Sequence, residues 1–174
     1  TPASREDRPY ALAMRWLMGG QVYDVSTGSF RTADIGIAHG RIATVGSGAR
    51  REHADDTIDA TGLWLLPGLI DCHVHLTLPT DAGDPAASAN RSDAAITLYA
   101  AGAAARTLHA GITTVRDVGG WNYVEMAVRD AVNSGSIPGP RMFLAGRLLS
   151  ITTSTVEYYP GMYEVADGAD AVRA

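Results

Sequence analysis

The sequence predicts an α/β protein in which a small β-rich module precedes alternating strands and helices. Two observations carry this prediction. Between Met14 and Leu66, short alternating apolar runs are separated by turns that contain glycine. After Pro67, strand-like apolar segments alternate with segments of helical periodicity, which is typical of a parallel sheet or barrel. The change of pattern divides the chain into predicted domains at residues 1–66 and 67–174.

Hairpin signals define the first domain. A Ser-Thr-Gly-Ser turn at 26–29 follows a β-branched run, and the alternating Ile35 and Ile37 lead to a tight turn at His39-Gly40. Two short alternating runs that flank an X-Gly pair predict a β-hairpin.

The second domain begins with an apolar run from Leu69 to Leu78, which predicts a parallel strand buried on both faces. Ser92 is a candidate helix cap, because a serine before a periodic segment accepts a backbone N–H of the first turn. The further predicted elements are a helix at 93–110, a strand at 112–116, a helix at 121–134, a strand at 141–145 and a helix that begins near Asp170.

Composition excludes several classes of function. The 174 residues carry a formal charge of −5, which argues against nucleic acid as the main partner. The longest apolar run is broken by Pro67 and Gly68, so no segment reaches the roughly 20 apolar residues of a membrane helix. Cys72 is the single cysteine and is predicted to be a packed core thiol. It slightly favours a cytoplasmic location but leaves secretion or a periplasmic location open.

The sharpest motif is Asp71-Cys72-His73-Val74-His75. Side chains two apart on a strand share a face, so we expect His73 and His75 to project together and Cys72 and Val74 to face the other side. Two imidazoles on one rigid strand are suited to a divalent metal. Asp71 shares their face one layer deeper, where it is placed to support a ligand through a hydrogen bond.

The bland interpretation of this motif is a pair of packed polar core residues. A His-x-His triplet alone is a weak signal because it occurs often by chance. Its position at the end of an apolar strand, directly after a β-rich module, favours the metal site.

Longer stretches resemble one known family. Residues 66–76 (LPGLIDCHVHL) resemble the first-strand signature of the amidohydrolase superfamily. Residues 34–46 resemble the N-terminal sandwich of that family, 110–120 its second strand, and 139–147 the entry and exit of its third. Within the superfamily, the chain is most similar to imidazolonepropionase-related enzymes and to Xaa-Pro and other aminoacyl dipeptidases. The resemblance implies part of a small β-sandwich followed by the first three βα units of a TIM (β/α)8 barrel, incomplete in this chain.

The resemblance also implies an enzyme and a site. It implies a zinc-dependent hydrolase with one or two divalent metals, in which a metal-bound hydroxide attacks the amide bond of a dipeptide or N-acyl amino acid. Only His73 and His75 map onto the family's metal ligands. Asp117 is a second candidate supporting residue beside Asp71, because it lies at the C-terminal end of the second predicted strand. For Asp117 we also expect a structural pairing with an arginine or a loop amide. The catalytic residues are expected beyond residue 174.

Two departures from the family pattern stand out. The family's carboxylated lysine has no counterpart, because all 14 basic residues are arginine. Residues 151–156 (ITTSTV) contain no histidine, whereas related enzymes often carry Gly-Gly-His there. We therefore expect this chain to be inactive alone and to need another chain or missing C-terminal residues to complete the barrel, in a homo-oligomer.

Two alternatives remain open at this point. The chain is also compatible with a non-catalytic truncated subunit or fragment that acts by association. A hydrolase of cyclic amides of the imidazolone type is the other alternative.

Overall fold

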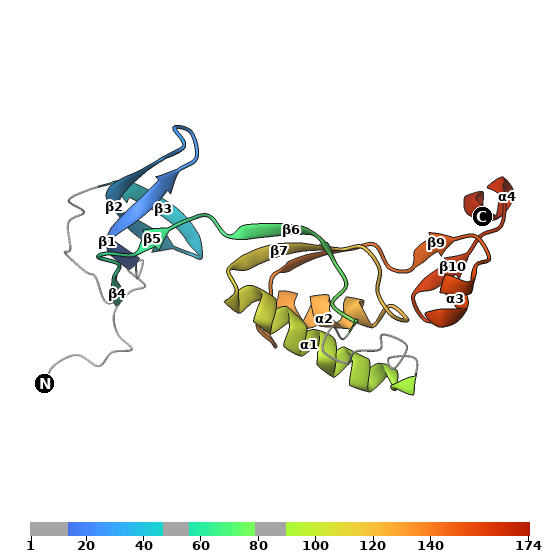
Figure 1. The fold of residues 1–174 in the computed structure, drawn as a ribbon. Coiled ribbons are helices and arrows are strands. Elements are labelled where there is room, and N and C mark those ends of the chain that lie inside the picture. Colours follow the sequence, from blue (N-terminus) through green and yellow to red (C-terminus); the bar gives the residue numbers. More distant parts are fainter. Residues whose placement is uncertain (1–13, 47–55, 79–89) are drawn as a thin grey trace, which may run out of the picture. The chain divides into compact units, whose positions relative to one another are not determined.

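The computed structural model describes residues 14–46, 56–78 and 90–174, and shows a mixed α/β protein, as predicted (Figure 1). The chain divides into two compact units, Thr1–Pro67 and Gly68–Ala174. Within the described ranges, no helix is long and apolar enough to cross a membrane.

The first unit is built on one sheet. Its strands are β1 (Arg15–Asp24), β2 (Ser29–Ala38), β3 (Arg41–Gly46), β4 (Asp56–Asp59) and β5 (Trp64–Leu65). The order is β3-β2-β1-β4, and β5 also pairs with β1. Both predicted hairpins are present, and His39 (φ 51°) and Gly40 (φ 70°) form the second turn in left-handed conformations. A sandwich needs two packed sheets, and the described part of this unit contains one.

The second unit begins with a parallel sheet of β6 (Leu69–Val74), β7 (Ile112–Asp117) and β8 (Arg141–Leu144), in that order. The helices α1 (Asp93–His109) and α2 (Val124–Asn133) connect these strands and lie together against one face (Figure 1). Their shared core contains Leu76, Ala100, Ala104, Val115, Val128 and Met142. Ser92 caps α1 as predicted, since its Oγ accepts the Ala95 N–H at 3.3 Å.

Two connections differ from the sequence prediction. Helix α2 begins at Val124 rather than 121, because Asn122 (φ 49°) and Tyr123 (φ 61°) are left-handed and cannot continue a right-handed helix. Between the strand predicted at 141–145 and the last helix, where no element is predicted from the sequence, the structure has β9 (Leu148–Ser150), α3 (Ser154–Tyr158) and β10 (Tyr163–Val165). The final helix, α4 (Ala169–Arg173), begins where the sequence predicts.

The predicted two-sided burial of the first barrel-like strand is wrong in this structure. Leu69 and Ile70 of β6 are 58% and 68% exposed, and Cys72 is exposed rather than packed. The physical reason is that β6 is an edge strand of the described sheet and that α1 and α2 cover only one face.

Candidate metal centre

The two motif histidines lie side by side at the end of β6. Their ring centroids are 5.3 Å apart and the rings are nearly perpendicular, at 80°. His73 lies within an irregularity of β6, because Asp71 pairs with Val115 and Val74, three residues later, pairs with Asp117, only two residues after Val115. Such a bulge bends the strand and re-aims its side chains. The side chain of Val74 packs against the helical core, whereas the imidazoles are not part of that core.

The ring of His75 is fixed by one hydrogen bond. Its Nδ1 lies 2.9 Å from the carbonyl oxygen of Gly119, in the connection between β7 and α2. A carbonyl oxygen only accepts, so Nδ1 carries the proton and, in the neutral imidazole, Nε2 keeps its lone pair. Metal-binding histidines are commonly oriented in this way. His75 therefore has the tautomer that a metal bound at Nε2 requires.

Asp71 supports His73 through the main chain. Its Oδ1 accepts the backbone N–H of His73 at 3.0 Å, across the irregular part of β6. The carboxylate thus stabilises the backbone that carries His73.

Asp117 links the residue that follows His75 to the connection that contacts the His75 ring. Its Oδ2 accepts the N–H of Leu76 at 3.0 Å, and its Oδ1 accepts the N–H of Gly119 at 3.0 Å. The side chain is buried, and of the two pairings expected for it, the loop amides are the partners observed. A third tie joins the same segments, because the Oγ1 of Thr77 accepts the N–H of Trp121 at 3.1 Å.

A second buried carboxyl lies beside this arrangement. Glu125, in the first turn of α2, is fully buried, and neither of its carboxylate oxygens has a hydrogen-bond partner among the described residues. Burial raises its pKa, and the nearby charge of Asp117 raises that pKa further. Burial also raises the pKa of Asp117, although the N–H groups of Leu76 and Gly119 oppose this shift. Two poorly solvated carboxyl groups, Asp117 and Glu125, therefore lie near each other beside the histidine pair.

Sequence reasoning missed Glu125, Thr77 and the carbonyl of Gly119. The Gly-Gly pair at 119–120 is the only sequence signal for them that we identify, because a Cβ on Gly120 would lie 1.9 Å from the Glu125 carboxyl carbon. Nothing in the sequence marks Glu125 as buried, since a glutamate in the first helical turn is usually solvated.

His73 and His75 are the residues of this chain that would hold a metal ion. Among the described residues, no group of three or more His, Cys, Asp or Glu side chains is placed to hold a metal. The donors that are present fit zinc, which binds imidazole nitrogen in small coordination numbers. In the stretch at 151–156, which contains no histidine, Thr152 donates to Asp167 through its N–H at 2.8 Å and its Oγ1 at 2.6 Å.

The first unit contains a separate hollow of about 350 Å³ on its sheet, lined by β1, β2, β3 and the segment that follows β5. Its lining is mostly apolar, and its charged members are Asp24 and Arg31. It contains no histidine or cysteine, so it lacks the donors of a transition-metal site.

Curated relatives match a short part of the chain. Adenine deaminase 2 of Rhizobium meliloti is 50% identical over 58 residues, which is 33% of this chain and 10% of the relative. Dihydroorotase of Geobacter metallireducens is 43% identical over 63 residues, which is 36% of this chain and 15% of the relative. The chain thus spans a small fraction of the length of these enzymes.

Solved structures match most of the chain. A prolidase complexed with N-methylphosphonate-L-proline has a TM-score of 0.76 and 26% identity, and the match covers 92% of this chain and 42% of that one. A Xaa-Pro dipeptidase with bound methionine has a TM-score of 0.70 and 30% identity, and covers 79% of this chain and 34% of that one.

The family model covers more of the chain than the curated relatives do. Residues 64–173 match the model of the Amidohydrolase family, a range that contains the paired histidines, Asp117 and both helices of the parallel sheet. By this match over more than half of its length, the chain belongs to the amidohydrolase family.

Proposed function

We propose that the protein is a metal-dependent amidohydrolase that cleaves the amide or peptide bond of a small substrate, a dipeptide or N-acyl amino acid. The observation that carries this proposal is the neighbouring pair of imidazoles, with the Nδ1 of His75 bonded to the carbonyl of Gly119. The likeness to a prolidase and to a Xaa-Pro dipeptidase supports the substrate class.

Each residue of the site has a distinct task in this proposal. His73 and His75 hold zinc through ring nitrogens, Asp117 fixes the backbone after His75, and Asp71 fixes the backbone of His73. A bound divalent metal supplies Lewis acidity, which lowers the pKa of water and polarises an amide carbonyl. Support of a ligand by such contacts is worth about 10- to 100-fold in metal affinity.

Additional ligands and the proton-transferring group are proposed to come from outside the described residues, from another chain or a further part of the polypeptide in a homo-oligomer. Two observations support this. The described residues offer no third metal donor beside the histidines. The described sheet also exposes apolar side chains, with Phe143 52% and Leu69 58% exposed, and a partner segment would cover such side chains.

Zinc titration tests the metal site directly. We expect the protein in its native assembly to bind about one zinc per chain, and His73→Ala and His75→Ala each to weaken that binding by at least the roughly 10- to 100-fold lost with a supporting residue. His39→Asn is the matched control, because His39 is exposed in a left-handed turn that asparagine tolerates. Equal zinc affinity in all four proteins would overturn the metal assignment.

A substrate panel tests the chemistry. Xaa-Pro and other dipeptides, N-acyl amino acids and cyclic amides would be compared with the zinc-loaded protein, in the assembly identified by native mass spectrometry. Cyclic-amide hydrolysis is the second candidate, favoured by the 43% identity with a dihydroorotase. Faster turnover of cyclic amides would replace the dipeptide proposal. An assembly that binds no zinc and cleaves no substrate would instead favour a subunit that acts by association.

A further inference from the structure

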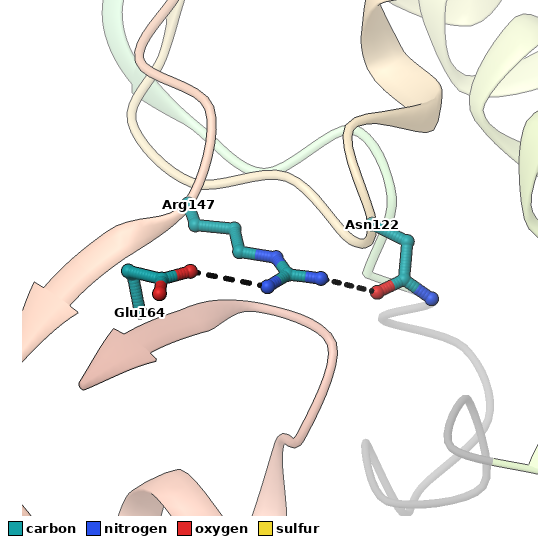
Figure 2. Close-up of polar contacts among 3 residues, drawn as sticks. All are labelled: Asn122, Arg147 and Glu164. Carbon is teal, nitrogen blue, oxygen red and sulfur yellow. Dashed lines mark hydrogen bonds and ion pairs between the residues drawn. The ribbon is translucent and has the colours of Figure 1, made fainter.

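A chain of polar contacts centred on Arg147 joins four segments of the second unit. One guanidinium nitrogen of Arg147 donates to Glu164 at 3.2 Å and another donates to the Oδ1 of Asn122 at 3.0 Å (Figure 2). The Nδ2 of Asn122 then donates to Asp93, at the start of α1, at 2.9 Å. Arg147 is 28% exposed, and its guanidinium also lies 5.2 Å from the ring centre of Tyr123. We call Glu164, Arg147, Asn122 and Asp93 the arginine relay.

The relay holds a strained part of the backbone. Asn122 and Tyr123 are consecutive left-handed residues, with φ of 49° and 61°. Asparagine tolerates this conformation, whereas it is uncommon for a bulky aromatic residue, so the surrounding contacts must offset the cost. Arg147 contacts both residues, because it bonds to the side chain of the first and stacks on the ring of the second.

The connection between β7 and α2, which contains Asn122 and Tyr123, also contacts the ring of His75. Gly119 accepts the Nδ1 proton of His75, and three residues later Asn122 accepts the bond from Arg147. Between them, the N–H of Gly120 donates to the carbonyl of Gly146 at 3.0 Å, beside Arg147 in the chain. A displacement of Asn122 would therefore be expected to move the carbonyl of Gly119, which orients the His75 ring, because only three residues separate them and the intervening Gly120 is itself hydrogen-bonded.

We propose that Arg147 is a positioning residue for the metal site, which holds the 119–123 connection so that Gly119 fixes the tautomer and orientation of His75. The inference rests on the proposed metal function, because orientation of the ring serves catalysis only if a metal binds there. The guanidinium suits this task better than an ammonium group, since its planar fork donates to two acceptors in fixed directions.

Three variants and a control test the relay. Arg147→Met keeps much of the aliphatic stem and removes both donors, and Arg147→Lys keeps the charge but not the fork. Asn122→Gly removes the acceptor while it permits the left-handed backbone. The control, Arg173→Met, removes an exposed ion pair of 2.8 Å to Asp170 within α4, which does not contact the site.

The decisive readout is the tautomer of His75, measured without metal from the NMR shifts of its ring nitrogens. We expect a protonated Nδ1 in the unmodified chain and in Arg173→Met, and a mixture of tautomers in Arg147→Met and Asn122→Gly. Zinc affinity should fall about 10- to 100-fold in the same two variants and less in Arg147→Lys. Thermal unfolding shows which variants are folded, and Asn122→Gly and Arg147→Lys carry the test if Arg147→Met does not fold.

The possible failures are distinguishable. An unchanged His75 tautomer in folded Arg147→Met or Asn122→Gly overturns the relay and leaves the proposed function intact. Absence of zinc binding in the unmodified protein in its native assembly overturns the proposed function, and with it the metal role of Arg147, whatever the tautomer. A tautomer change without loss of zinc affinity also overturns the role, because the ring would then be oriented by the metal alone.

Discussion

The Oδ2 atom of Asp117, the last residue of β7, accepts the backbone N–H of Leu76, the residue after His75, at 3.0 Å. Its other oxygen accepts the N–H of Gly119, whose carbonyl bonds to the ring of His75. One buried carboxylate therefore fixes both the backbone and the ring environment of a proposed ligand. A side chain of β7 thus positions His75, which follows β6 in the chain.

Asp117→Asn is expected to damage this arrangement. An amide offers one accepting oxygen, and its NH2 group would face the second N–H donor, so one buried N–H loses its partner. We expect a loss of about 1.5–3 kcal/mol in the free energy of unfolding, the range for hydrogen bonds to a charged group. Urea denaturation measures it, with Asp130→Asn as the control because the Asp130 side chain is 65% exposed. Equal stability of the two variants would contradict the proposed role of Asp117.

Glu125 is expected to make stability depend on pH. Its folded pKa lies above the ordinary value of 4.5, chiefly through burial, so the folded state holds the proton more tightly than the unfolded state. This contribution is fully present below pH 4.5, and it is lost as pH rises through the folded pKa. Glu125→Gln should flatten the decline of stability above pH 4.5.

The measurement for Glu125 is chemical denaturation across pH 4 to 8. Asp117 contributes a decline of the same sign that begins above its ordinary value of 3.8, and this part should persist in the variant. Glu157→Gln, at an exposed position of α3, should keep the full pH dependence of the unmodified chain. A profile of Glu125→Gln that matches this control would show that Glu125 is not desolvated.

Gly120→Ala is expected to destabilise the second unit. An added Cβ would lie 1.9 Å from the carboxyl carbon of Glu125, which is buried and has no free space into which to move. Overpacking of this kind costs about 1–3 kcal/mol. Gly46→Ala serves as the control, since no atom lies within 4 Å of its added Cβ. In thermal unfolding, the double variant Gly120→Ala/Glu125→Ala should lose less stability than the sum of the two single changes.

Ser92→Ala is expected to cost about 1 kcal/mol of stability, because α1 loses the side-chain acceptor for the N–H of Ala95. Ser92→Asp should retain the cap and add a favourable charge at the positive end of the helix. Circular dichroism during urea denaturation measures both variants. Identical midpoints for Ser92→Ala and the unmodified chain would mean that the cap contributes nothing.

Local chemistry explains what the sequence predicts well. The hairpin at His39-Gly40 and the start of α1 at Ser92 each depend on residues within a few positions, and both are present. The rings of His73 and His75 are adjacent, as strand alternation predicts, although β6 is irregular between Asp71 and Val74 and His75 follows the strand. The buried state of Glu125 depends instead on how the 119–123 connection folds over α2, which no local pattern encodes. The exposure of Cys72 depends on which sheet faces are covered, and this is a tertiary property as well.

The pairing of β6 with β7 contains two irregularities of opposite sense. From Leu69 to Ile70 the partner advances from Ile112 to Thr114, and from Asp71 to Val74 it advances only from Val115 to Asp117. The two offsets cancel. The pairing register is therefore the same at both ends of the two strands and differs by one residue in the middle. Loss of a single residue from either strand would leave an offset uncorrected and turn the histidines toward the opposite face. The spacing of this segment is therefore under stricter constraint than its side chains, and insertions or deletions here should be tolerated only in compensating pairs.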